Sequence, residues 1–170
     1  TIHGNCTLTT GNANTGDAGV LVIDGNLTCA NGGTGNGVTA AATGTIDVGG
    51  DLIVNNAGAA ALVNNSSGNF TVQGNAQITG AVDNNDTGDI VVLGSMVVAL
   101  GIVTDLSTGD ITIYGDLTAD ALVNTVAGIV TIRGNCTLRL TGNLNNGVGT
   151  INIIGVLKIN GVITNAGTLN

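Results

Sequence analysis

ITIYGDLT, residues 111–118, is the stretch of sequence that decides the fold. Two isoleucines alternate with a threonine, a glycine and an aspartate follow, and a second alternating run starts at Leu117. Alternation with period two is the spacing of a strand and not of a helix. The same pattern recurs along the whole chain, and its corner glycines lie 19 to 25 residues apart: Gly4, Gly25, Gly50, Gly74, Gly94, Gly115, Gly134 and Gly155.

Each repeat of about 21 residues contains three short alternating runs. A unit this small cannot bury its apolar face alone, so the repeats are expected to stack on one another. The sequence therefore predicts an all-β, single-domain parallel β-helix (β-solenoid) over residues 1–170, with about eight coils, three short strands per coil and uncapped ends. One inward row of this solenoid is expected to contain Val72, Val92, Ile113, Ile132 and Ile153.

The composition agrees with this fold and restricts the function. Among 170 residues there are 29 glycines and no proline, and the formal net charge is −8. Glycine permits a positive φ at each corner, and proline would remove a hydrogen bond from strands paired on both sides. Three basic side chains are too few to neutralise a phosphate backbone, so no nucleic-acid partner is expected. No apolar run is long enough for a membrane-spanning helix.

The first residue is Thr1 and not methionine, which indicates either a processed mature product or part of a longer chain. Processing is the favoured interpretation, and it implies secretion. We therefore expect an extracellular or cell-surface location. In that setting the Asn-X-Ser/Thr sequons are possible N-glycosylation sites. There are seven of them, at Asn5, Asn26, Asn64, Asn65, Asn69, Asn85 and Asn135.

Asparagine and aspartate recur at two positions of the repeat. One row directly follows the corner glycine and is interrupted by Ser95 and Val156; the other lies four residues before the glycine that opens the next repeat. An amide ladder is favoured over calcium ligation, because the acidic members are dispersed among amides. Only residues 32–36 are similar to half of a calcium-binding nonapeptide. The rows are Asn5, Asn26, Asp51, Asn75, Asp116 and Asn135, and Asn64, Asn84, Asp105, Asn124 and Asn145.

Few residues suit catalysis. His3 is the only histidine, and the carboxylates of Asp47, Asp89 and Asp110 fall outside the inward positions. This placement indicates a solvated face and not the paired carboxylates of a glycosidase. No enzymatic activity, metal ion or cofactor is therefore expected.

The three cysteines, Cys6, Cys29 and Cys136, fall on inward positions of the second run. Cys6 is expected to stack on Leu27, and Cys29 beneath Leu8, so the two thiols of adjacent coils are diagonal to each other. Buried free thiols are favoured over a disulfide.

Threonines share an outward offset on two faces and raise the alternative of an ice-binding surface. Other residues interrupt both rows, so β-propensity on an exposed strand is the favoured explanation. The rows are Thr71, Thr112 and Thr131 on the first face, and Thr7, Thr28, Thr118 and Thr137 on the second.

Several words of the sequence resemble the repeats of bacterial surface β-solenoids, including filamentous-haemagglutinin-type adhesins. They are Gly25-Asn26-Leu27-Thr28, Gly115-Asp116-Leu117-Thr118 and residues 162–169. They are also similar to the solenoid core of bactofilins. The second resemblance implies end-to-end polymerisation.

A solenoid end exposes the unpaired backbone groups of a whole coil. Residues 1–4 match the strand that residues 167–170 begin, so we expect a non-enzymatic structural protein that stacks head to tail into an extracellular filament or surface fibre. The alternatives are a carbohydrate- or cell-binding adhesin segment of a longer protein and an ice-binding module. The polymer interface is expected within residues 1–10 and 156–170, at Thr1, Ile2, Leu8, Leu157, Ile159, Ile163, Leu169 and Asn170.

Overall fold

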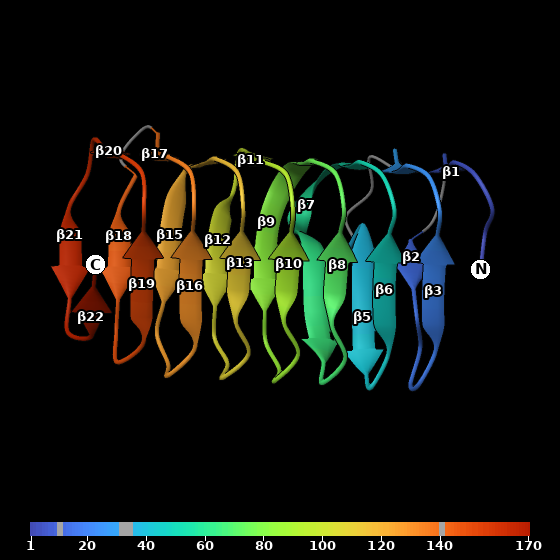
Figure 1. The fold of residues 1–170 in the computed structure, drawn as a ribbon, viewed down its shortest axis with the longest axis horizontal. Coiled ribbons are helices and arrows are strands. Elements are labelled where there is room, and N and C mark those ends of the chain that lie inside the picture. The colour runs from blue at the N-terminus through green and yellow to red at the C-terminus, as the bar shows by residue number, and fades with distance from the viewer. Residues whose placement is uncertain (10–11, 31–35, 140–141) are drawn as a thin grey trace.

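The computed structural model describes residues 1–9, 12–30, 36–139 and 142–170, with the side chains of 57–60 left out. Every described strand pairs in parallel with the strand one repeat away. The coils stack into a rod whose N- and C-termini lie at opposite ends (Figure 1). The prediction of a single-domain parallel β-solenoid is confirmed.

The rod makes about seven turns, one fewer than predicted. The eight corner glycines enclose only seven intervals, because Gly4 lies at the start of the first turn and Gly155 in the last one. The turns are held by backbone hydrogen bonds between equivalent residues, such as Gly115 N–H to Gly94 O at 2.9 Å.

Three faces surround the interior. The first face is an eight-stranded sheet that consists of β3 (Val20–Ile23), β6 (Thr45–Val48), β8 (Phe70–Val72), β10 (Ile90–Val92), β13 (Ile111–Ile113), β16 (Ile129–Ile132), β19 (Thr150–Ile153) and β22 (Thr168–Leu169). The second face contains β1 (Cys6–Leu8), β4 (Leu27–Cys29), β11 (Met96–Ala99), β14 (Leu117–Ala119), β17 (Cys136–Leu138) and β20 (Leu157–Ile159). The third contains β2 (Ala13–Asn14), β5 (Val38–Ala42), β12 (Ile102–Asp105), β15 (Ala121–Asn124), β18 (Leu144–Asn146) and β21 (Ile163–Asn165).

Two coils differ from the prediction of three short strands. β7 (Leu52–Ser66) and β9 (Ala76–Asn84) each run through the second and the third face without a break. These two strands join both faces into one 14-stranded sheet. The corner between those faces is therefore a bend in a continuous strand in two of the coils, and a turn in others.

The core follows the predicted inward positions. Val92 pairs in register with Val72 and Ile113, and Ile132 continues the row from Ile113 to Ile153, as predicted. Ile113 is fully buried among aliphatic neighbours of the same row. Stacking identical positions fills the interior with Val, Ile, Leu and Ala in register.

The corner glycines are required for a reason that differs from the prediction. Only Gly4 of the eight has a positive φ, at 102°. At Gly50 an added Cβ would lie 2.2 Å from Asn26 Oδ1 and 3.0 Å from the carbonyl carbon of Gly25. Glycine is therefore needed because the backbone of the preceding coil approaches too closely for a side chain.

Candidate functional site

The outer polar row forms a continuous ladder along one corner. The side-chain oxygen of each member accepts the backbone N–H of the residue one coil later, as in Asn75 N–H to Asp51 Oδ1 at 2.7 Å. The predicted interruption at Ser95 is wrong, because the Ser95 Oγ accepts the Asp116 N–H at 3.0 Å and continues the row. The row ends at Val156, whose N–H donates to Asn135 Oδ1 at 3.0 Å but whose side chain has no acceptor.

A second outer ladder lies at another corner, and the sequence analysis missed it. Asn69 Oδ1 accepts the Asp89 N–H at 3.1 Å, and Asp89 Oδ1 accepts the Asp110 N–H at 2.9 Å. Asp110 Oδ1 then accepts the Ile129 N–H at 2.9 Å. The sequence signal is an acceptor side chain directly after the opening glycine in three consecutive repeats, at Asn69, Asp89 and Asp110. Asp89 and Asp110 therefore act as structural acceptors on the surface, in agreement with their predicted outward position.

The polar row that was predicted four residues before the glycine of the next repeat lies inside the rod, at the corner between the third and the first face. Asn64, Asn84, Asp105 and Asn124 are in register and fully buried. Asn145 was predicted as the next member, but it is exposed, and the buried partner of Asn124 is Asn146. The turn after β18 is one residue shorter than the preceding turn, so a count backwards from the glycine selects the wrong residue.

The buried amides donate to carbonyl oxygens of the corner. Asn124 Nδ2 donates to Gly128 O at 3.0 Å and to Thr150 O at 3.2 Å. Asn146 Nδ2 donates to Asn165 Oδ1 at 2.8 Å, which is an amide–amide contact of the predicted kind. Burial raises the pKa of Asp105, the one acidic member, to about 6. The ladder prediction is confirmed, and the calcium-like segment 32–36 lies largely outside the described residues.

The cysteines are free thiols, as predicted. Cys6 pairs in register with Leu27, and Leu8 with Cys29, so the predicted diagonal arrangement is confirmed. Burial raises the pKa of the Cys29 thiol to about 11 and that of Cys136 to about 12. Both buried thiols are therefore protonated and act as small apolar side chains.

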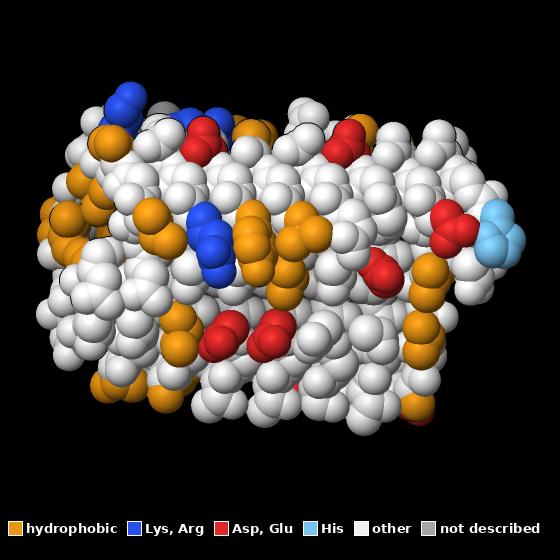
Figure 2. Space-filling view, in the orientation of Figure 1, with side chains coloured by type: hydrophobic (Ala, Val, Ile, Leu, Met, Phe, Trp, Pro, Cys, Tyr) orange, Lys and Arg blue, Asp and Glu red, His pale blue; other side chains and the backbone are white. Residues whose placement is uncertain are grey.

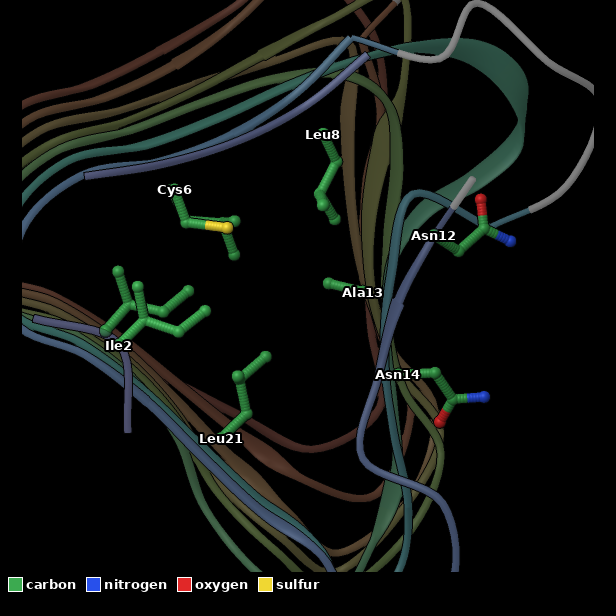
Figure 3. Close-up of a pocket in the computed structure, with 9 residues that line it drawn as sticks. Ile2, Cys6, Leu8, Asn12, Ala13, Asn14 and Leu21 are labelled. Carbon is green, nitrogen blue, oxygen red and sulfur yellow. The ribbon is translucent and has the colours of Figure 1, made fainter. Parts of the chain in front are cut away.

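The predicted interface residues form two groups at opposite ends of the rod. At the N-terminal end a hollow of about 220 Å³ opens among Ile2, Cys6, Leu8, Asn12, Ala13, Asn14, Leu21, Ile23 and Leu27, and Figure 3 shows the apolar members pointing into it. Thr1 is exposed at the same end. At the C-terminal end Leu157, Ile159 and Leu169 are half-buried, and Ile163 and Asn170 are exposed. In both end coils inward apolar side chains remain partly exposed, because among the described residues a neighbouring coil covers them on one side only.

The sides of the rod carry few charges. Figure 2 shows scattered acidic and basic side chains on one face, His3 at the N-terminal end, and hydrophobic side chains gathered at the C-terminal end. His3 Nδ1 lies 2.5 Å from Asp24 Oδ2, and the Arg133 guanidinium lies 4.5 Å from the centre of the Tyr114 ring. The predicted threonine rows are in register only as short runs, such as Thr112 with Thr131 and Thr118 with Thr137.

The sequon asparagines differ in accessibility. Asn64 is fully buried, and its Nδ2 donates to Asn84 Oδ1 at 3.0 Å and to Gly88 O at 2.9 Å. Asn64 is therefore not available for glycosylation in the folded chain. The exposed members are Asn5, Asn26, Asn65, Asn69, Asn85 and Asn135.

Within the described residues, no group of three or more His, Cys, Asp or Glu side chains is placed to hold a metal ion. The same residues include no helix that is long and apolar enough to cross a membrane. Comparison of the chain with protein-family models, with curated proteins and with solved structures finds no match. The fold is that of solenoid repeat proteins in general, and no match supports the adhesin or bactofilin family. The function is therefore inferred from the geometry of the chain itself.

Proposed function

We propose that the chain is a non-enzymatic structural protein, the protomer of an extracellular filament or surface fibre that grows by head-to-tail stacking of solenoids. The proposal rests on the complementarity of the two ends. Each end presents inward apolar side chains and a strand edge, which another coil of the same shape would cover. The contact joins unlike surfaces, so it propagates and does not close.

The row that contains Leu21 supports this stacking most directly. Leu21 pairs with Ile46, and the row continues through successive coils to Ile151 and Leu169. Among the described residues none stacks on Leu21 from the N-terminal side, because Ile2 pairs with Ile23, two positions further on. Leu169 of a second copy occupies the inward position that is missing above Leu21.

The strand positions of the two ends also follow one another. Thr168 pairs with Thr150 and Leu169 with Ile151, so residues 168–170 form the first part of a strand on the first face. Each strand of the first face has two inward positions, and Leu169 holds the first of them. Ile2 holds the second, because it pairs with Ile23, which belongs to the same inward row as Ile132 and Ile153. Asn170 lies opposite Asn152, at the strand position that Thr1 holds before Ile2. A second copy that contributes Ile2 onward, with its Thr1 outside the strand, would complete one coil with the Leu169 segment of the first copy.

Such a joint is expected to be dry and insensitive to salt. The side chains that would meet are apolar, with Leu157, Ile159 and Leu169 on one copy and Cys6, Leu8 and Leu21 on the other. Apolar contacts of this kind are not screened by ions, in contrast to surface ion pairs.

Electron microscopy and sedimentation of the purified chain test the proposal. We expect thin continuous fibres, and the variant Leu169→Lys should give monomers or short oligomers because a charge would enter the joint. Thr168→Lys is the matched control, since Thr168 is exposed and the fibres should persist. Monomers of the unmodified chain at high concentration would overturn the proposal. Glycan binding or inhibition of ice recrystallisation by those monomers would instead support the adhesin or the ice-binding alternative.

Crosslinking tests the register of the joint separately. In a chain whose native cysteines are replaced by alanine, Leu21→Cys together with Leu169→Cys should form disulfides between copies, because equivalent positions of adjacent coils lie about 4.8 Å apart. Thr168→Cys with Leu21→Cys is the control, with the new thiol on the outside. Fibres without the expected crosslink would contradict the register and leave the filament itself supported.

A further inference from the structure

Asp105 is a buried carboxyl group in a row of amides. It lies at the end of β12, is fully buried, and pairs in register with Asn84 in the preceding coil and Asn124 in the next. Its Oδ1 accepts two long hydrogen bonds, of 3.4 Å each, from the N–H and the hydroxyl group of Ser107. Its Oδ2 is buried and has no hydrogen-bond partner within the part of the chain that the structure describes.

The asparagines show what this corner requires. Asn64 Nδ2 donates to Gly88 O at 2.9 Å, Asn124 Nδ2 to Gly128 O at 3.0 Å, and Asn146 Nδ2 to Thr168 O at 2.8 Å. In these three coils an N–H group of the side chain is directed at backbone carbonyl oxygens, whereas Asn84 Nδ2, next to Asp105 in the row, has no hydrogen-bond partner among the described residues. The corner is therefore built to receive a hydrogen-bond donor.

In Asp105 an oxygen occupies the position of that donor. A Cβ added to Gly149 would lie 2.4 Å from Asn124 Nδ2 and 2.6 Å from Gly128 O. A Cβ added to Gly128, the equivalent glycine one coil earlier, would lie 2.4 Å from Asp105 Oδ2 and 2.7 Å from Gly109 O and Ser107 O. Relative to this glycine, Asp105 Oδ2 therefore takes the place that Asn124 Nδ2 takes one coil later, and a carboxylate there would direct an acceptor toward the carbonyl oxygens of the corner.

We propose that Asp105 is an internal proton-binding site, at which the neutral carboxylic acid donates its Oδ2–H to the carbonyl oxygens of the corner in place of an amide N–H. The proton comes from solvent, and no other group is consumed. A proton needs no additional space, so the acid fits the position that the asparagines occupy in the neighbouring coils. The site makes the solenoid more stable in acid than at neutral pH, and it is independent of the proposed filament.

The surrounding charges favour the neutral form. The other ionisable residues on β9, β12, β15 and their adjoining turns are acidic: Asp83, Asp86, Asp89, Asp110 and Asp120. Asp120 is paired with the Arg139 guanidinium at 3.2 Å, so its charge is offset. Burial raises the pKa of Asp105 from 3.8 to about 6, and repulsion by Asp110 adds to this shift, whereas hydrogen bonds from Ser107 and a weaker interaction with the Asn84 side chain oppose it. Burial also raises the pKa of Asp83.

The sign of the pH dependence follows from this direction. Because the pKa in the folded chain is above that in the unfolded chain, the folded chain binds more protons between the two values. The stabilisation is complete below pH 4 and is lost as the pH rises through about 6.

Carbon-detected NMR of the Asp105 carboxyl group in the unmodified chain tests the proposal directly. We expect its titration midpoint at or above pH 6, and a midpoint near the ordinary value of 3.8 would overturn the proposal. This measurement requires no variant and therefore does not depend on the folding of one.

Thermal unfolding of Asp105→Asn between pH 4 and pH 8 gives the second readout. Asparagine supplies the donor at every pH, so Tm at pH 8 should exceed that of the unmodified chain by roughly 5 °C, with a smaller difference at pH 4. Asp89→Asn is the matched control, because its amide oxygen can still accept the Asp110 N–H and no pH-dependent gain is expected. An equal or lower Tm of Asp105→Asn at pH 8 would contradict the proposal.

Discussion

The middle coils and the end coils carry the same types of inward residue in different surroundings. Ile113 in β13 is fully buried between Val92 and Ile132, whereas Ile159 in β20 is only half-buried and Ile163 in β21 is 45% exposed. The alternating pattern within a coil is the same in both regions. The difference shows that a coil obtains its buried interior from its neighbours and not from its own sequence, and the ends lack one neighbour.

The largest change in stability is expected when a charge is placed in the interior of a middle coil. Ile113→Asp places an unpaired charge in a dry row and should lower the free energy of unfolding by about 4 kcal/mol. Ile159→Asp should cost less, about 1 kcal/mol in the isolated chain, because solvent reaches the end coil. Urea denaturation of both variants measures the difference.

Thr112→Asp is the control for this prediction, since Thr112 lies between two buried isoleucines and points outward. Its effect should remain below about 1 kcal/mol. If Thr112→Asp and Ile113→Asp destabilise the chain equally, the assignment of inward and outward positions is wrong.

The rows of the middle coils were predictable because their determinants are local. Alternation over three residues defines which side chains point inward, and the glycine repeat defines which residues stack. These two local patterns were enough to predict the row through Ile113 and the contact of Cys6 with Leu27. Features that depend on the path between strands were not predictable, such as the continuous strands β7 and β9.

The polar rows show the same limit. Counting from a glycine selected Asn145 in place of Asn146, because the length of the turn varies from coil to coil. The residue type at Ser95 predicts a gap in the outer row of Asn and Asp side chains, although a hydroxyl group accepts the same hydrogen bond as an amide oxygen. The special position of Asp105 was not predictable from the sequence either, since only the packing shows that its Oδ2 takes the place of an asparagine amide nitrogen.

Thiol alkylation compares the solvent access of a cysteine in the end coil with that of a cysteine in the interior of the rod. Cys136 is fully buried in β17 with its pKa raised to about 12, whereas Cys6 is half-buried and lines the hollow at the N-terminal end. Because the thiolate is the reactive form, Cys6 should react with iodoacetamide at least about a hundredfold faster than Cys136 at pH 8. Peptide mass spectrometry of each site measures the rates. Equal rates in the folded chain would mean that the middle coils open as readily as the ends.

The smallest expected effect concerns the outer ladder, which is complete in the middle of the rod and stops at Val156. Asn75 Oδ1 accepts the Ser95 N–H at 2.9 Å, so Asn75→Ala removes an acceptor and should cost about 1 kcal/mol. Val156 is 58% exposed, and in the isolated chain Val156→Asn should change the stability by less than about 0.5 kcal/mol.

In a stacked assembly the same substitution has a different consequence. The order of the ladder places Asn5 of the next copy one coil beyond Val156. The valine side chain offers no acceptor to the backbone N–H of that Asn5. Val156→Asn supplies that acceptor and should strengthen the joint by about 1 kcal/mol, which lowers the critical concentration for assembly about fivefold. Val156→Ala, which adds no acceptor, should leave the critical concentration unchanged in sedimentation assays. If Val156→Ala lowers the critical concentration fivefold as well, the effect is due to the loss of the valine side chain. If Val156→Asn does not lower the critical concentration in a chain that still forms fibres, Asn5 does not follow Val156 at the joint.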